Sequence, residues 1–83
     1  MSGKTIAVFR RKLGMSQGEF AFALGLAGAN VVSRWETGRR APNEAVRRVI
    51  RYLNELPSPE AKGIVRKLKS YGAERELGNT NHD

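Results

Sequence analysis

Four polar residues between positions 30 and 37 have the spacing of one helical face. At about 100° per residue, Ser33, Arg34 and Thr37 all fall within about 60° of Asn30. Asparagine can form two hydrogen bonds with adenine, and arginine two with guanine, both in the major groove of DNA. A helix over about 29–37 would therefore offer Asn30, Ser33 and Arg34 to base edges. The alternative is an ordinary surface helix with a polar outer side.

The other side of the same helix is apolar. Val32 and Trp35 point away from Asn30, so this side can pack on a core while the polar side stays accessible. Because Trp35 lies on the apolar side, we expect it to be a core residue and not a platform on which bases stack.

A second short helix is predicted just before this one. Ser16 and Glu19 have the spacing of a capping box, in which each side chain accepts a hydrogen bond from the other residue's backbone N–H. Phe20, Ala21 and Leu24 then form an apolar stripe that ends at Gly25. Two short helices joined by a tight turn are the layout of a DNA-binding helix-turn-helix.

The positive charge of the chain is concentrated around these helices. Residues 1–54 hold ten Lys and Arg against three Glu, whereas residues 55–83 hold five of each sign. The formal net charge of +7 therefore lies entirely in the first segment. Such segregation favours a polyanionic partner, because nucleic-acid affinity depends strongly on phosphate neutralisation.

Composition excludes several other classes of protein. Eighty-three residues with 40% apolar content support one small globular domain. No stretch is long and apolar enough for a membrane span or a signal peptide, so we expect no membrane association and a cytoplasmic location. There is no Cys and a single His, His82, so neither a disulfide nor a Cys/His metal site is expected. We expect no cofactor and no enzymatic activity, because the groups for nucleophilic or two-carboxylate catalysis are missing.

Three further helices complete an all-α, five-helix prediction. Each is assigned from a one-turn apolar stripe: residues about 4–13 with Ile6, Phe9 and Leu13, residues 44–56 with Val46, Val49, Ile50 and Leu53, and residues about 59–71 with Ala61, Ile64, Val65 and Leu68. The predicted domain spans 1–71, with its core at 4–56 and an additional C-terminal helix. From Gly72 onward only Leu77 is large and apolar, so we expect 72–83 to be a disordered tail.

Several of these residues together resemble a known family. The resemblance rests on Leu13-Gly-Met-Ser-Gln-Gly-Glu-Phe-Ala, Leu24-Gly, Val32-Ser-Arg-Trp-Glu, and Gly38 with Pro42, over roughly residues 4–56. This combination is similar to the XRE/Cro-C1 helix-turn-helix family. The resemblance implies a compact lambda-repressor-like domain that binds operator DNA as a dimer, with its third helix in the major groove.

The start of the third helix departs from the usual family pattern. Leu24-Gly-Leu-Ala-Gly28 adds one residue and lacks the usual hydroxyl cap, so the sequence does not define how the helix is capped. Gly28-Ala-Asn-Val-Val-Ser-Arg-Trp-Glu36 is similar to the DNA-binding domain of MqsA-type antitoxins. In that subgroup the asparagine and arginine contact bases, which implies the same role for Asn30 and Arg34.

The resemblance also implies roles outside the base-contacting face. Gln17 matches a position that hydrogen-bonds a DNA phosphate, although it could simply cap its helix. Arg39 and Arg40 are predicted to contact the DNA backbone, as is Thr37, although the basic loop could simply be solvated. Arg10 and Glu36 match an internal ion pair between the first and third helices. A further group, Arg47, Arg48 and Arg51, could extend the phosphate contacts or form a solvated helix face.

A single recognition helix covers only a few base pairs, so we expect a homodimer on a palindromic double-stranded operator. The candidate interface residues lie on the last two helices: Leu53, Leu56, Ile64, Val65 and Leu68. The final helix could instead close the core of the monomer. Phe22 could mark a protein contact or pack beneath the final helix.

Together these features favour a transcriptional repressor of its own operon, of an antitoxin-like or phage type. One alternative is a protein-interaction module, such as an antitoxin that neutralises a cognate toxin. Another is a non-specific nucleic-acid binder.

Overall fold

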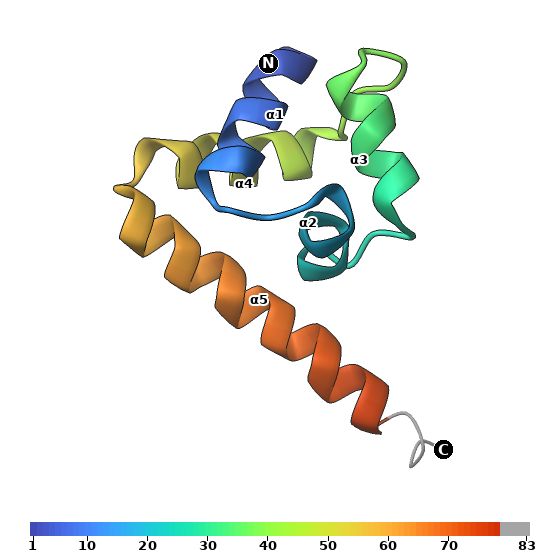
Figure 1. The fold of residues 1–83 in the computed structure, drawn as a ribbon, viewed down its shortest axis with the longest axis vertical. Helices are drawn as coiled ribbons and strands as arrows, with labels where there is room; N and C mark the ends of the chain where they lie inside the picture. Colours follow the sequence, from blue (N-terminus) through green and yellow to red (C-terminus); the bar gives the residue numbers. More distant parts are fainter. Residues whose placement is uncertain (79–83) are drawn as a thin grey trace.

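A computed structural model describes the backbone of residues 1–78 and the side chains of residues 1–73. The described residues form five helices and no strand (Figure 1). The helices are α1 (Gly3–Lys12), α2 (Gln17–Ala23), α3 (Ala29–Glu36), α4 (Glu44–Glu55) and α5 (Ser58–Gly78). This confirms the all-α helix-turn-helix prediction. The helices α1, α3 and α4 begin and end within one residue of the predicted positions, and α2 lies between the predicted cap at Ser16 and the predicted stop at Gly25. Within the described residues, no helix is both long and apolar enough to cross a membrane.

Side chains cap three of the helices at their N-termini. The oxygen of Ser2 accepts a hydrogen bond from the backbone N–H of Thr5, and that of Asn43 accepts one from Val46. At α2 the capping box is complete, because Ser16 Oγ accepts from the N–H of Glu19 and the Glu19 carboxylate accepts from the N–H of Ser16. These bonds satisfy N–H groups that have no partner within their own helix.

Glycines end the first three helices in the same way. Gly14, Gly25 and Gly38 have φ values of 71°, 73° and 81°, a region that other residues rarely adopt. After α2, Gly25 N–H donates to the carbonyl of Phe22 and Leu26 N–H donates to that of Ala21. This is a Schellman motif, which stops the helix and reverses the chain toward the next element.

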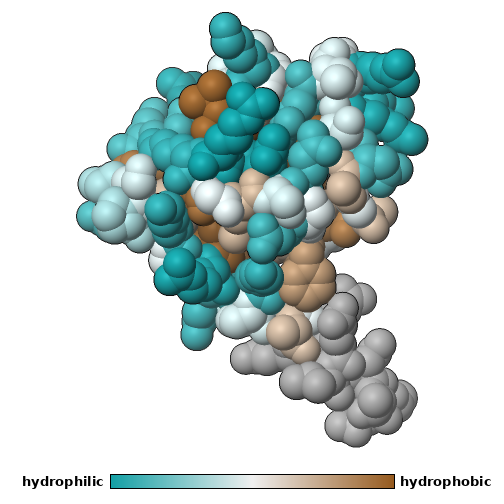
Figure 2. All heavy atoms as spheres, viewed as in Figure 1, coloured by the Kyte–Doolittle hydropathy of each residue, from teal (hydrophilic) through white to brown (hydrophobic). Residues whose placement is uncertain are grey.

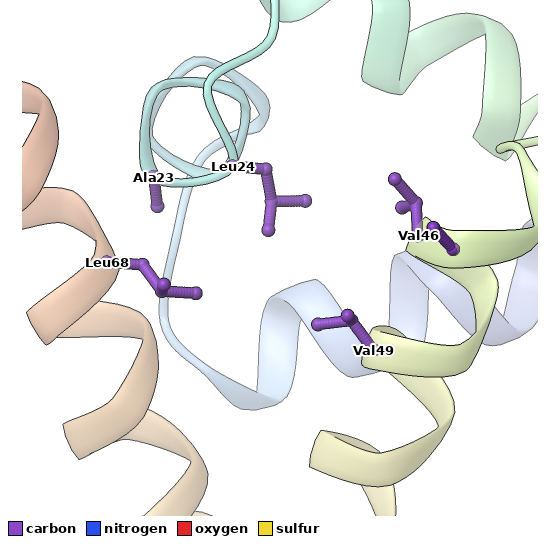
Figure 3. Close-up of a pocket in the computed structure, with 6 residues that line it drawn as sticks. Ala23, Leu24, Val46, Val49 and Leu68 are labelled. Carbon is purple, nitrogen blue, oxygen red and sulfur yellow. The ribbon is translucent and has the colours of Figure 1, made fainter.

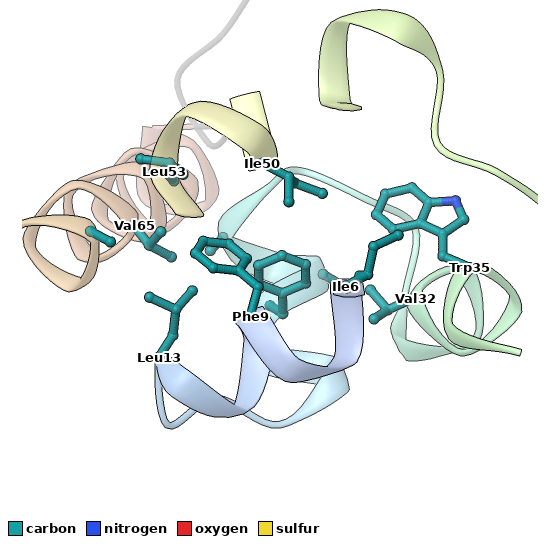
Figure 4. Packing of buried hydrophobic residues seen from close by; sticks show 12 residues of the cluster. Ile6, Phe9, Leu13, Val32, Trp35, Ile50, Leu53 and Val65 are labelled. Atoms are coloured by element: carbon teal, nitrogen blue, oxygen red, sulfur yellow. The ribbon is translucent and has the colours of Figure 1, made fainter. Parts of the chain in front are cut away.

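The five helices enclose one apolar core. Phe9 and Phe20 lie at its centre with their rings edge to face, 6.1 Å apart between centroids. Trp35 is buried beside them, which confirms its prediction as a core residue. Figure 4 shows side chains from all five helices converging on this cluster. Its members are Ile6, Phe9, Leu13, Phe20, Ala21, Ala23, Val32, Trp35, Ile50, Leu53, Ala61 and Val65.

Two residues that the apolar stripes placed in the core lie at the surface. Val49 is 43% exposed and Ile64 is 38% exposed, because α4 and α5 make only limited contact and leave these stripe positions partly uncovered. The final helix also differs from its prediction, because it passes Gly72 and continues to Gly78. One glycine inside a helix costs only about 1 kcal/mol. Residues 79–83 of the predicted disordered tail lie outside the described residues.

The N-terminus of α1 lies very close to the C-terminal end of α3. A Cβ atom at Gly3 would lie 2.5 Å from the carbonyl oxygen of Trp35 and closer still to that of Glu36. Both neighbours are backbone atoms of a helix, so neither can move aside cheaply. Gly3 therefore permits the contact between α1 and α3.

We expect Gly3→Ala to destabilise the protein by about 1–3 kcal/mol, because the new methyl group must separate the two helices. Gly18→Ala is the matched control, since a Cβ there meets only Ser16 Oγ at 3.9 Å. The control should be neutral or stabilise by up to about 1 kcal/mol, because alanine favours the helix. Urea unfolding followed by circular dichroism measures both, and equal free energies for the two variants would contradict the close contact.

Candidate nucleic-acid interface

The two sides of α3 differ in burial as the helical spacing predicts. Val32 is fully buried and Trp35 is 6% exposed, so this side is packed on the core. Asn30 and Arg34 are exposed, and Ser33 between them is half-buried. The base-contacting candidates therefore lie together on the accessible side of the helix.

These candidates line one surface concavity of about 420 Å³. Asn30, Ser33 and Arg34 contribute from α3, Thr37 from its C-terminal end and Arg39 from the following loop. The tertiary structure thus brings the loop arginine to the same hollow as the three helix residues. Arg40 is exposed but is not among the lining residues.

The loop after α3 that carries Arg39 and Arg40 is hydrogen-bonded to the recognition helix at the carbonyl group of Arg34. The backbone N–H groups of Arg39 and Arg40 donate to the carbonyl oxygen of Arg34, at 2.9 and 3.2 Å. Gly38, with its positive φ, allows the chain to reverse at this point. The position of both loop arginines is therefore tied to that of Arg34.

The hydroxyl of Thr37 has acceptors within the protein. Its hydroxyl donates to the carbonyl of Ser33 at 2.9 Å, with the carbonyl of Arg34 at 3.3 Å. A phosphate oxygen can only accept a hydrogen bond, and the single hydroxyl hydrogen of Thr37 is already used within the protein. In the free protein the Thr37 hydroxyl is thus bonded at the C-terminal end of α3, and its predicted contact with the DNA backbone stays a prediction.

The Glu36 carboxylate at the end of α3 joins three helices. Arg10 of α1 donates to it through Nε at 2.6 Å and through Nη2 at 3.2 Å. Gln17 of α2 donates through Nε2 at 3.0 Å, and Arg10 Nη1 also donates to the carbonyl of Met15 at 2.8 Å. This geometry confirms the predicted ion pair and adds two partners that the sequence did not indicate.

Gln17 therefore already has a role inside the protein. One N–H of its amide is bonded to Glu36, and the second remains for another acceptor. Because the side chain is half-buried at the start of α2, its predicted contact with a phosphate stays a prediction. Any such contact would be linked through Glu36 to the end of the recognition helix.

The ion pair between Arg10 and Glu36 is mostly buried, and it changes the pKa of Glu36. The side chains of Arg10 and Glu36 are only 12% and 9% exposed. The hydrogen bond from Arg10 lowers the pKa of Glu36 below its usual value, with a further contribution from Gln17, against the opposing effect of desolvation. The charged form of Glu36 is thus the form that the fold stabilises.

The arginines of α4 differ in pairing from those of α3 and its loop. On α4, Arg47 and Arg48 pair with Glu44 at 2.7 and 2.9 Å, and Arg51 pairs with Glu55 at 3.6 Å. These pairs favour the solvated-face interpretation of the α4 arginines over a phosphate track. In contrast, within the described side chains no carboxylate forms an ion pair with Arg34, Arg39 or Arg40. The arginines beside the concavity are therefore not neutralised by a described carboxylate.

The start of α3 has no side-chain cap, as the unusual turn sequence suggested. Gly28 occupies the cap position, and its carbonyl accepts a hydrogen bond from the N–H of Val31 at 3.1 Å. The extra residue is accommodated by the turn after Gly25, so α3 still begins at Ala29.

The predicted dimer residues do not form one surface. Leu53 and Val65 are 3% and 0% exposed and belong to the core of the protomer, so they are removed from the candidate interface. Leu56 is half-buried and packs against the same core. Ile64 is exposed, and Leu68, like Leu56, is half-buried.

Leu68 lines an apolar groove of about 260 Å³ between α2, α4 and α5. Figure 3 shows Ala23 of α2 and the following Leu24, Leu68 of α5, and Val46 and Val49 of α4 around this groove. Phe22, the neighbour of Ala23, is covered by α5 at Gly72. The groove is thus distinct from the polar concavity on α3.

A short helix packed against an eight-residue recognition helix, with an exposed polar and cationic face, defines a DNA-binding helix-turn-helix protein. The comparison with protein families agrees, because the family model described as Helix-turn-helix matches residues 6–59. The chain belongs to this helix-turn-helix family, of the XRE type. No curated protein and no solved structure matches it significantly. The family match does not separate subgroups, so the similarity to MqsA-type antitoxins stays a prediction.

We expect Glu36→Gln to lower the free energy of unfolding at pH 7 by roughly 3 kcal/mol, because Arg10 then loses its charged partner in a mostly buried site. The folded pKa of Glu36 is lowered, so its contribution is complete above the unfolded pKa of about 4.3 and is lost as pH falls through the folded value. The difference between wild type and variant should therefore shrink below about pH 4. Thermal unfolding from pH 7 to pH 2 measures this dependence.

Glu44→Gln is the control for this experiment. Glu44 also has a lowered pKa, through its hydrogen bonds from Arg47 and Arg48, but its side chain is 60% exposed and solvent screens the pairs. Its replacement should change stability far less. A difference for Glu36→Gln that persists unchanged at pH 2 would contradict the ion-pair interpretation.

Proposed function

We propose that this protein is a sequence-specific transcription regulator that binds double-stranded operator DNA as a homodimer and represses its own operon. The observation that carries the proposal is the concavity on α3. It presents Asn30, Ser33 and Arg34 together, with Arg39 at its edge and no described carboxylate paired with either arginine. A major groove offers the complementary hydrogen-bonding groups and the negative phosphates that such a surface requires.

Asn30 and Arg34 are assigned to base contacts and Ser33 to a supporting hydrogen bond. The two longer side chains are one turn apart on a helix whose other side is buried, so their relative position is well defined. Bidentate contacts need such a fixed position, because two hydrogen bonds must form at once. A rigid pair of this kind favours sequence-specific binding over the non-specific alternative, for which charge alone suffices.

Arg39 and Arg40 are assigned to the DNA backbone. Both are exposed, and both lie in a loop whose N–H groups are bonded to Arg34. A phosphate contact through this loop would therefore fix the depth and angle at which α3 enters the groove. Gln17 would add a second backbone contact at the start of α2.

The homodimer is assigned to the apolar face of α4 and α5. Among the described side chains, four of the six exposed large hydrophobic residues lie on these helices: Val49, Tyr52, Ile64 and Tyr71. Of these, Val49 also lines the groove between α2, α4 and α5. Because the α4 arginines are paired with Glu44 and Glu55, α4 can meet a second copy with less charge repulsion than the face of α3.

Repression follows from where such a dimer would bind. A dimer on an operator that overlaps a promoter would exclude polymerase by occupying the same DNA. For a toxin partner the structure offers no support at Phe22, which packs against α5, whereas the exposed Ile64 and Tyr71 of α5 would suit a protein partner as well as a second copy.

We expect Asn30→Ala and Arg34→Ala each to weaken binding to the operator by about 1–3 kcal/mol and to relax base preference. Fluorescence anisotropy with DNA from upstream of the gene and with a scrambled duplex, at two salt concentrations, measures both effects. Arg39→Ala should weaken the two duplexes equally and reduce the salt slope by about 1.

Arg48→Ala is the matched control for the arginine variants, because Arg48 is exposed and already paired with Glu44 on α4. Its effect on either duplex should be small. If Arg34→Ala weakened the operator and the scrambled duplex by the same factor, the base-contacting role would be wrong.

We expect Ile64→Asp to weaken the dimer at least about tenfold, because it places a charge in the apolar interface. Sedimentation equilibrium measures the association. Val8→Asp is the control, since Val8 is also an exposed apolar residue, at 54%, but lies on α1. Equal dimer dissociation constants for wild type and Ile64→Asp would place the interface elsewhere.

A further inference from the structure

The last helix lies almost entirely outside the segment that defines the family. The family match ends at residue 59, whereas α5 runs from Ser58 to Gly78. Although α5 follows α4 in the chain, its more extensive contact is with α2 (Figure 1). The seven-residue α2 is therefore held between α3 on one side and α5 on another.

One contact between α2 and α5 depends on a glycine. A Cβ atom at Gly72 would lie 3.1 Å from Cζ and 3.3 Å from Cε2 of Phe22. The absence of a side chain at residue 72 thus lets the aromatic ring lie directly against the backbone of α5. At Gly63, in the same helix, a Cβ would meet nothing within 4 Å.

A second contact joins the same two helices one turn away. Lys69 Nζ lies 3.9 Å from the carboxylate of Glu19. The same carboxylate accepts the Ser16 N–H in the capping box at the start of α2. As an exposed pair it adds little stability, but it places α5 beside the first turn of α2 as well as beside Phe22.

The position of α3, the recognition helix, depends on that of α2. Gln17, at the start of α2, is bonded to Glu36 at the end of α3, and the two helices share an extensive packed contact. A shift of α2 would therefore move both the proposed phosphate contact and the support of α3. Misplacement by a fraction of an ångström is sufficient to weaken paired hydrogen bonds to bases.

We propose that α5 positions the helix-turn-helix for DNA binding through the contact between Phe22 and Gly72. Phe22 and Gly72 are positioning residues, since they act on DNA through α2 and do not touch it. This inference rests on the proposed function, because DNA binding is the property that the contact supports. It assigns to the final helix a role in recognition in addition to closing the core.

The test compares Gly72→Val with Gly63→Val in the full chain. Both substitutions place the same side chain inside α5, so their effects on helix propensity are matched. Gly72→Val should weaken operator binding roughly three- to thirtyfold, by displacing Phe22 and with it α2. Gly63→Val should leave operator binding unchanged.

Phe22→Leu supplies the rescue, because leucine lacks the outer ring atoms that a Cβ at residue 72 would meet. The double variant Phe22→Leu with Gly72→Val should recover most of the operator affinity lost by Gly72→Val alone. Unchanged affinity in Gly72→Val, with the protein folded, would overturn the proposal, as would a loss that Phe22→Leu does not restore. Gly72→Ala provides a milder change if the valine variant is unfolded.

Backbone amide shifts separate this inference from the proposed function. Gly72→Ala should shift the NMR amide signals of Gln17–Ala23, and Gly63→Ala should not. If wild type shows no preference for operator DNA while these signals shift, the proposed function fails and the contact stands. If wild type binds its operator and the signals do not move, the positioning role fails alone.

Discussion

The carboxylate of Glu36 is the point on which the arrangement of the DNA-binding helices depends. An eight-residue helix is too short to be stable by itself in water, so α3 must be held by its neighbours. Apolar packing holds its inner side, and the bonds from Arg10 and Gln17 hold its C-terminal end. Because one carboxylate receives donors from α1 and α2, the relative positions of three helices are coupled through a few atoms. Glycine at position 3 lets α1 approach closely enough for this arrangement.

The arginines of this protein differ in whether a nearby carboxylate neutralises them. Figure 2 shows that hydrophilic side chains cover much of the surface in that view, with apolar residues between them. The arginines of α4 face carboxylates one turn away, whereas those of α3 and its loop have none among the described side chains. The net charge alone therefore does not show that α4 carries paired arginines whereas α3 and its loop carry ones without a described carboxylate partner. A polyanion would be attracted to the end of the molecule that carries α3 and its loop.

The helices themselves were predictable because their signals are local. Caps at Ser16 and Asn43, glycines after α1 to α3, and one-turn apolar stripes all act within a few residues, and the observed bounds follow them closely. Exposure was less predictable, because it depends on what each helix packs against. Val49 and Ile64 belong to apolar stripes, yet the limited contact between α4 and α5 leaves them at the surface. The final helix passes Gly72 because residues on both sides of it support helix, which outweighs one unfavourable residue.

By itself, the sequence determined the helical elements, the separation of polar and apolar sides on α3, and the segregation of positive charge. Each of these follows from periodicity or composition, which need no knowledge of distant residues. Only the tertiary structure decided which apolar residues stay exposed, that Thr37 and Gln17 are bonded within the protein, and that Arg39 joins the concavity on α3. It also decided that α5 lies along α2 against Phe22. The physical reason is that these outcomes depend on the directions of helices and the reach of individual donors, which are set only when the whole core is packed.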